Sequence, residues 1–162
     1  MLNGKICCDN RIDSMDLTKE IVHAEAMRLI KGKIDLLQNQ ILELSSDADI
    51  KSTSGDKHET SRAMMHLQQE QLTTQLGELR SQMNKLSSLR DSVLSKKISE
   101  GSLIVTDKAI FYLSIAFGRI AFSENSVYLL SVNSPLGRIL CDKIENEIVN
   151  MNGTNYRILK IN

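Results

Sequence analysis

Apolar residues recur at helical spacing along the first 100 residues of the chain. The first stripe has successive spacings of four, three, four and three residues, which is typical of the seam of a coiled-coil helix. Its members are Ile30, Ile34, Leu37, Ile41 and Leu44, and Leu17, Ile21, Ala24 and Met27 extend it upstream. This pattern predicts a helix that begins between residues 15 and 18 and ends near Ser46.

A second stripe repeats at strict seven-residue intervals. Its members are Met65, Leu72, Leu79, Leu86 and Val93, with Leu76 and Met83 between them. It predicts a helix from about residue 56 to about residue 96, roughly 60 Å long at 1.5 Å per residue. Residues 45–55 form a short linker rich in Ser, Asp and Gly. The low closure entropy of a short linker favours an antiparallel hairpin within one chain over an extended dimer.

The pattern changes beyond Gly101, where short segments rich in β-branched and aromatic residues indicate strands. They lie at residues 103–105, 110–117, 119–122, 127–132, 147–151 and 156–161. Residues 135–142 are typical of a short helix, with Ser134 as N-cap and Pro135 at its first position. We predict an α+β protein: a leader at 1–14, a coiled-coil hairpin at 15–97, and a small antiparallel sheet with one short helix at 98–162.

Charge is balanced overall but uneven around the linker. The chain has 20 Lys and Arg against 20 Asp and Glu, so no basic field indicates nucleic-acid binding. Near the linker, five acids face only Lys51 and Lys57; the acids are Glu43, Asp47, Asp49, Asp56 and Glu59. The end of the hairpin is therefore acidic, which favours a cationic surface or a metal as its target.

The three cysteines, Cys7, Cys8 and Cys141, have neither metal-ligand spacing nor the even count of a secreted disulfide framework. No apolar run approaches the length needed to span a membrane, and no signal peptide is recognisable. We expect a cytoplasmic protein with no membrane partner.

Asp56 and Glu59 are the strongest candidates for chemistry. Asp followed three residues later by Glu is a capping box, expected wherever a helix begins. The same two carboxylates face one way on the first turn of a helix, as ligands of Mg²⁺ must. Two residues alone cannot hold Mg²⁺ tightly, so such a metal would be shared with a partner. The residues themselves leave both interpretations open.

Two segments of the chain resemble one bacterial family. Residues 55–60, Gly-Asp-Lys-His-Glu-Thr, resemble the Gly-Asp-Leu-Ser-Glu-Asn motif at the hairpin tip of the transcript cleavage factors GreA and GreB. Ser134-Pro135-Leu136-Gly137-Arg138, followed by residues 143–149, resembles a second segment of that family. Both motifs occur in the family's order, with the hairpin before the sheet, so the resemblance covers residues 17 to 161.

The resemblance implies a fold and a function. The fold is a helical hairpin followed by an FKBP-like domain, which docks at the secondary channel of RNA polymerase through Ser134 and Pro135. Asp56 and Glu59 would help to place a second Mg²⁺ in the polymerase active site, where the 3′ end of backtracked nascent RNA is hydrolysed. The isolated protein would bind no metal, would not itself be an enzyme, and would work as a monomer.

The chain also departs from the family's pattern. Thr60 replaces an asparagine, Ala63 a tyrosine, and Asp142 and Asn146 replace two glycines, which leaves open the loop geometry around the predicted short helix. Two alternatives stand beside cleavage: a secondary-channel regulator that inhibits polymerase, and a coiled-coil adaptor whose tip acids only cap a helix. Prolyl isomerase activity is the least favoured, because so small a sheet with few aromatic residues offers little to build its pocket.

Overall fold

The computed structural model describes residues 17–50, 59–90, 95–122 and 125–162, with only the backbone for helical residues 47–50 and 59–61. The chain divides into two compact units, one of them Glu20–Val93 and the other including Leu94–Asn162. The α+β prediction is confirmed: two long helices packed together precede, in sequence, a mostly antiparallel six-stranded sheet with a short helix. None of the helices within these ranges is long and apolar enough to cross a membrane.

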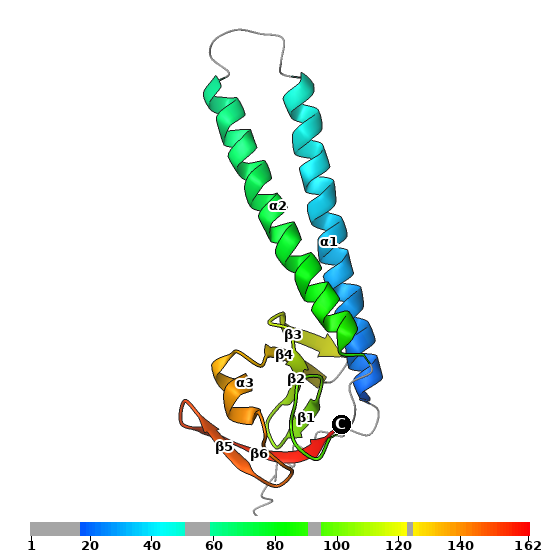
Figure 1. Cartoon of the computed structure of the whole chain (residues 1–162), viewed down its shortest axis with the longest axis vertical. Coiled ribbons are helices and arrows are strands. Elements are labelled where there is room, and N and C mark those ends of the chain that lie inside the picture. The colour runs from blue at the N-terminus through cyan, green and yellow to red at the C-terminus, as the bar shows by residue number, and fades with distance from the viewer. Residues whose placement is uncertain (1–16, 51–58, 91–94, 123–124) are drawn as a thin grey trace, which may run out of the picture. The chain divides into compact units, whose positions relative to one another are not determined.

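The first unit is a helical hairpin. Helix α1 (Lys19–Ile50) and helix α2 (Glu59–Ser88) lie side by side (Figure 1). Ile30 and Ile34 of α1 and Leu76 and Leu86 of α2 are buried. Apart from the upstream extension of the first stripe, the other described members of the two predicted seams are half-buried: Leu37, Ile41, Leu44, Met65, Leu72, Leu79 and Met83. Both heptad stripes are therefore confirmed over these positions, and the hydrophobic effect along the seam holds the helices together.

The upstream extension of the first stripe was wrong at Ile21 and Ala24, whereas Leu17 and Met27 are half-buried. Ile21 is 48% exposed and Ala24 is exposed, whereas Val22 and Ala26 are fully buried. Three consecutive steps of three residues separate Ile21 from Ile30, and at about 100° per residue they place the two side chains on opposite sides of the helix. Steps of four residues, from Val22 to Ala26 to Ile30, keep one face inward.

Helix α2 also ends earlier than predicted, at Ser88 and not near residue 96. The amides of Leu89 and Arg90 donate to carbonyl groups three residues earlier, at 3.0 and 3.4 Å, which tightens the chain into a turn. Ser88 Oγ donates to the Lys85 carbonyl at 2.7 Å. Such serine side chains compete with the hydrogen bonds of the helical backbone, so the consecutive serines Ser87 and Ser88 favour a helix end. Val93 lies outside the described residues.

All six predicted strands form, and their order across the sheet is β3-β4-β2-β1-β6-β5. Their bounds are β1 Leu103–Thr106, β2 Ile110–Ser114, β3 Gly118–Phe122, β4 Asn125–Ser131, β5 Ile148–Met151 and β6 Thr154–Ile161. Every neighbouring pair is antiparallel except β2 and β4, which pair in parallel. After β2 the chain first forms the edge strand β3, and β4 then runs back between β3 and β2. Asn152 and Gly153, both with positive φ, form the two-residue turn between β5 and β6.

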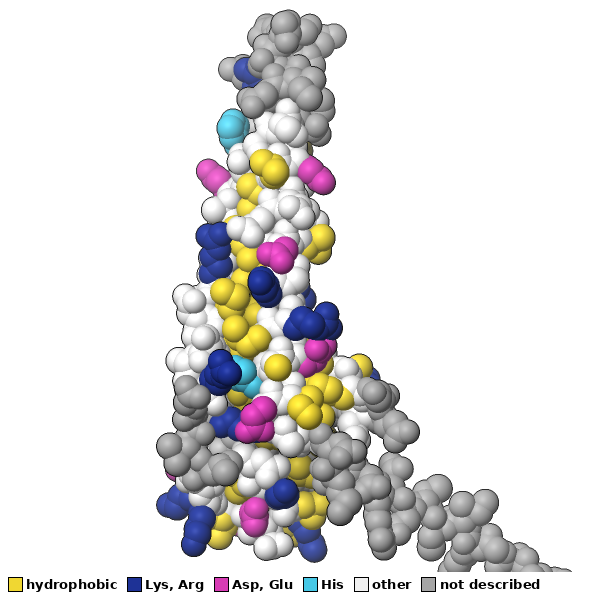
Figure 2. Space-filling model, turned by 90° about the vertical axis from the view of Figure 1, so that its right-hand side faces the viewer, with side chains coloured by type: hydrophobic (Ala, Val, Ile, Leu, Met, Phe, Trp, Pro, Cys, Tyr) yellow, Lys and Arg dark blue, Asp and Glu magenta, His cyan; other side chains and the backbone are white. Residues whose placement is uncertain are grey.

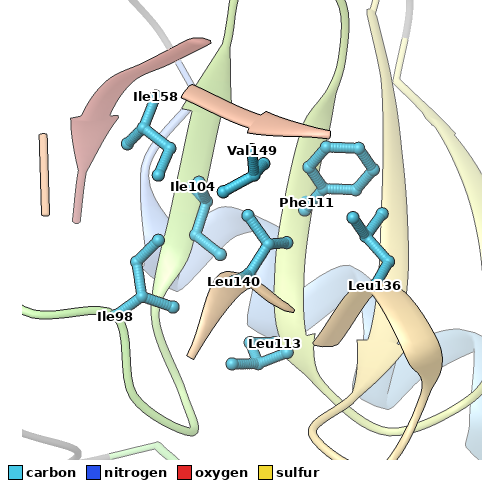
Figure 3. Close-up of a cluster of buried hydrophobic side chains, with 8 residues drawn as sticks. All are labelled: Ile98, Ile104, Phe111, Leu113, Leu136, Leu140, Val149 and Ile158. Carbon is cyan, nitrogen blue, oxygen red and sulfur yellow. The ribbon is translucent and has the colours of Figure 1, made fainter. Parts of the chain in front are cut away.

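Helix α3 (Pro135–Leu140) covers one face of the sheet. Leu136 and Leu140 of α3 point toward the buried strand residues Ile104, Phe111 and Leu113 (Figure 3). Ile98, Val149 and Ile158 complete this buried cluster. A core built from one helix and four strands fixes the start of α3, and with it the residues Ser134 and Pro135.

Candidate functional site

The two tip acids lie at or beyond the edge of what the structure describes. Asp56 lies outside the described residues, and Glu59 is the first residue of α2, described by its backbone alone. The N-terminus of a helix carries the positive end of the helix dipole, which favours a carboxylate there whether it caps or binds a metal. Both roles of Asp56 and Glu59 therefore stay predictions.

The part of the hairpin nearest the linker exposes large apolar side chains. Leu42 on α1 is 69% exposed, and Met64 and Leu67 on α2 are 70% and 56% exposed. Figure 2 shows such apolar side chains among charged ones along one side of the hairpin. Leu42 and Leu67 belong to neither predicted seam, so their position off the heptad repeat is the signal that could have identified them. They leave apolar surface available to a partner.

Ser134 and Pro135 occupy the start of α3 as predicted. Ser134 Oγ accepts a hydrogen bond from the Gly137 amide at 3.0 Å and donates one to the Ser131 carbonyl at 2.7 Å. The Ser134 backbone is extended, with φ −67° and ψ 154°, as an N-cap residue requires. Pro135 follows at the first helical position, where its missing N–H leaves no hydrogen bond unmade, and its side chain is exposed.

The remaining residues of this segment are explained mostly by packing. Leu136 is 8% exposed and reaches the core of the sheet domain. Gly137 is required for a close approach: a Cβ there would lie 2.9 Å from Ser134 Oγ and closer still to the Ser131 carbonyl oxygen. Arg138 is exposed. Pro135 and Arg138 are thus the members of the segment whose side chains are free to contact a partner protein.

The loop after α3 has the backbone geometry of glycine at the two positions, 142 and 146, where the family has glycines. Asp142 has φ +63° and Asn146 has φ +71°, in the left-handed region that glycine enters most easily. Asp and Asn tolerate this region better than other residues with side chains, because their short polar groups bond locally. The loop after α3 therefore holds a backbone conformation suited to glycine without a glycine in either position.

Electrostatic interactions around this loop are local. Lys143 Nζ lies 2.9 Å from Glu147 Oε2, and the Ile144 amide donates to Glu147 Oε1 at 3.1 Å. These two hydrogen bonds, that of Lys143 first, hold the pKa of Glu147 below its usual value. Burial, with the charges of Asp142 and Glu100, raises the pKa of the Cys141 thiol. Cys141 therefore stays protonated at neutral pH and is a poor nucleophile.

Among the described residues, no group of three or more His, Cys, Asp or Glu side chains could hold a metal ion. The side chains of Asp56 and Glu59 are outside that set. A site made from these two carboxylates alone would lack most of the six oxygen ligands that Mg²⁺ requires. A Mg²⁺ ion shared with a partner therefore stays a prediction for Asp56 and Glu59.

Replacing Ser134 by Ala is expected to destabilise the sheet domain by about 1 kcal/mol, because the cap to the Gly137 amide is lost. Asn at position 134 should recover most of this stability, since its side chain can also cap. Thermal unfolding followed by tyrosine fluorescence measures the effect, because every Tyr of the chain lies in the sheet domain. Equal stability of the wild type and the Ala variant would show that the cap contributes nothing.

Comparisons with known proteins place little constraint on function. No protein-family model matches the sequence. No curated protein matches it either. Among solved structures, the chain is similar to the crystal structure of GreA factor homolog 1 (Gfh1) of Thermus thermophilus. The TM-score is 0.33 and the identity 10%, over 84% of this chain and 94% of that chain. A likeness at this level carries no argument about function, which must be inferred from the residues themselves.

Proposed function

We propose that this protein binds RNA polymerase at its secondary channel and stimulates cleavage of the 3′ end of backtracked RNA. The observation that carries the proposal is a long helical hairpin. Its second helix, α2, begins at Glu59, which follows Asp56 by three residues in the sequence. The two helices have 32 and 30 residues. At 1.5 Å per residue each is about 45 Å long, and the segment that connects them follows α1 and precedes α2.

In this proposal the protein supplies ligands and the polymerase supplies the rest of the active site. Asp56 and Glu59 would hold a second Mg²⁺ jointly with polymerase carboxylates, and that ion would lower the pKa of a bound water. Water attacks the phosphorus atom, the bond to the 3′ oxygen of the upstream nucleotide breaks, and that oxygen takes up a proton. In a channel with little water, carboxylates orient such a water more strongly than they would on a free surface.

The sheet domain would provide the docking contact. The side chain of Pro135 is exposed at the start of α3 and that of Arg138 one turn later, while the intervening residues are committed to the core. The exposed Leu42, Met64 and Leu67 would add apolar contacts along the channel. In this proposal the sheet domain binds polymerase and the hairpin delivers negative charge. These separate roles explain why the hairpin tip carries acids although the chain as a whole is neutral.

Stalled, backtracked polymerase complexes with labelled RNA test the proposal. We expect wild-type protein to shorten the RNA and to co-elute with the complex. Co-elution without shortening would replace cleavage with the alternative of a channel-occupying regulator. Absence of both would return the hairpin to the class of coiled-coil adaptors, with Asp56 and Glu59 serving only as a helix cap.

A further inference from the structure

Aromatic side chains from three strands meet on the face of the sheet that α3 covers in part. The ring centroids of Phe111 on β2 and Tyr128 on β4 are 5.9 Å apart, and those of Phe111 and Tyr156 on β6 are 5.6 Å apart. Phe111 is buried, whereas Tyr128 is 37% exposed and Tyr156 half-buried. We call Tyr128, Phe111 and Tyr156 the aromatic row; it offers two accessible rings around a fixed buried one.

A cation lies at each end of the aromatic row. Lys108, in the turn between β1 and β2, places Nζ 5.8 Å from the centre of the Tyr156 ring. Arg119 on β3 is the register partner of Tyr128, and directly paired residues of an antiparallel ladder share a face. Both cations are exposed. Rings between two positive charges match a ligand that alternates flat apolar groups with negative charges.

The guanidinium of Arg119 is held in place by one hydroxyl group. Its Nε and one terminal nitrogen both donate to Ser126 Oγ, at 2.9 and 2.7 Å. A serine hydroxyl that accepts two hydrogen bonds still carries its own O–H donor. A donor beside a cation at the end of a stacking surface suits a ribose 2′-hydroxyl next to its phosphate, a pair that DNA lacks.

From this arrangement we propose that the aromatic row with Lys108 and Arg119 is a binding site for single-stranded RNA. Two unpaired bases stack on Tyr128 and Tyr156, while the flanking phosphates contact Arg119 and Lys108. Stacking on aromatic side chains is tolerant of base identity, so the site selects for unpaired RNA and not for a particular sequence. Its polar contacts to phosphate make binding weaken as salt is added.

Fluorescence anisotropy with a labelled oligouridine of about ten nucleotides tests the site at low salt, using the full chain without polymerase. Tyr128→Leu or Tyr156→Leu keeps an apolar contact with Phe111 but removes a ring. We expect either change to weaken binding about tenfold, and Arg119→Gln to weaken it about as much. In parallel, the amide resonances of β2, β4 and β6 should shift when wild-type protein is titrated with the RNA.

Arg157 provides the matched control, since it is an exposed arginine next to Tyr156 on β6 and points to the opposite face of the sheet. Arg157→Gln should leave RNA binding unchanged, and the corresponding deoxyribose oligomer should bind more weakly than RNA. The proposal is overturned if wild-type protein binds no RNA, if Arg157→Gln matters as much as Arg119→Gln, or if a proline-rich peptide binds the row and RNA does not. Because the assay holds no polymerase, its failure leaves the proposed cleavage function standing.

Discussion

Changing Asp56 to Asn together with Glu59 to Gln is expected to abolish stimulated RNA cleavage, lowering its rate on the order of 100-fold or more. Both amides can still accept a hydrogen bond from a backbone N–H, so the side chains keep their capacity to cap the start of α2. Neither amide carries the negative charge that a Mg²⁺ ligand requires. Cleavage of labelled RNA in backtracked complexes measures the rate, and co-elution with polymerase measures binding.

Glu70→Gln is the matched control for the charge itself. Glu70 is exposed on α2, three turns beyond Glu59, so its neutralisation changes the charge of the same helix away from the tip. We expect this variant to cleave at the wild-type rate. Full cleavage by the Asp56 and Glu59 double variant would refute a ligand role for the tip acids. Loss of polymerase binding in that variant would instead assign the two acids to docking.

The hairpin could be predicted from the sequence where its apolar spacing averages about 3.5 residues, close to the 3.6 residues of a helical turn. From Ile30 to Leu44 the stripe alternates steps of four and three, and the structure buries or half-buries every member. Upstream, three steps of three drift by half a turn, and Val22 takes the place assigned to Ile21. Apolar identity alone did not decide between them, because both are β-branched side chains of similar character.

The strands were predicted from local composition, but their arrangement was not. Pairing of β2 with β4 in parallel depends on where β3 lies, and no local pattern records which edge a strand joins. The N-cap at Ser134 was predictable because the cap, the proline and the amide that it satisfies are adjacent in sequence. The aromatic row was not, since it unites residues from three strands that lie up to 45 positions apart.

Within the segment from Ser134 to Arg138, the role of Gly137 could likewise not be predicted from local sequence. Its neighbours have local roles that the sequence indicates, but the need for glycine arises from the Ser131 carbonyl, which belongs to the end of β4. Only when β4 and α3 are both packed does this oxygen approach the helix. A motif can therefore depend on a residue whose role is set by packing between elements.

Replacing Gly137 by Ala is expected to destabilise the sheet domain by about 3 kcal/mol or more, since the new Cβ overlaps the Ser131 carbonyl oxygen and either β4 or α3 must move. For a domain of this size, the melting temperature should fall by roughly 15 °C. Near-UV circular dichroism isolates the effect, because all Phe and Tyr residues lie beyond Gly101. Far-UV signal from the hairpin helices should persist to a higher temperature than the aromatic signal of this variant.

Two further substitutions identify the overlap as the cause. Gly77→Ala on α2 has no atom within 4 Å of its new Cβ and replaces a poor helix former, so it should stabilise the hairpin by about 0.5–1 kcal/mol. Adding Ser134→Gly to Gly137→Ala removes the hydroxyl but not the nearer Ser131 carbonyl, and should restore no stability. Recovery in that double variant would place the conflict at the Ser134 side chain, whereas an unchanged melting temperature for Gly137→Ala alone would mean that β4 and α3 separate without cost. If the double variant recovers no stability and Gly137→Ala alone lowers the melting temperature, the close approach of α3 to the Ser131 carbonyl is the cause. That approach then fixes the position of the exposed side chains of Pro135 and Arg138.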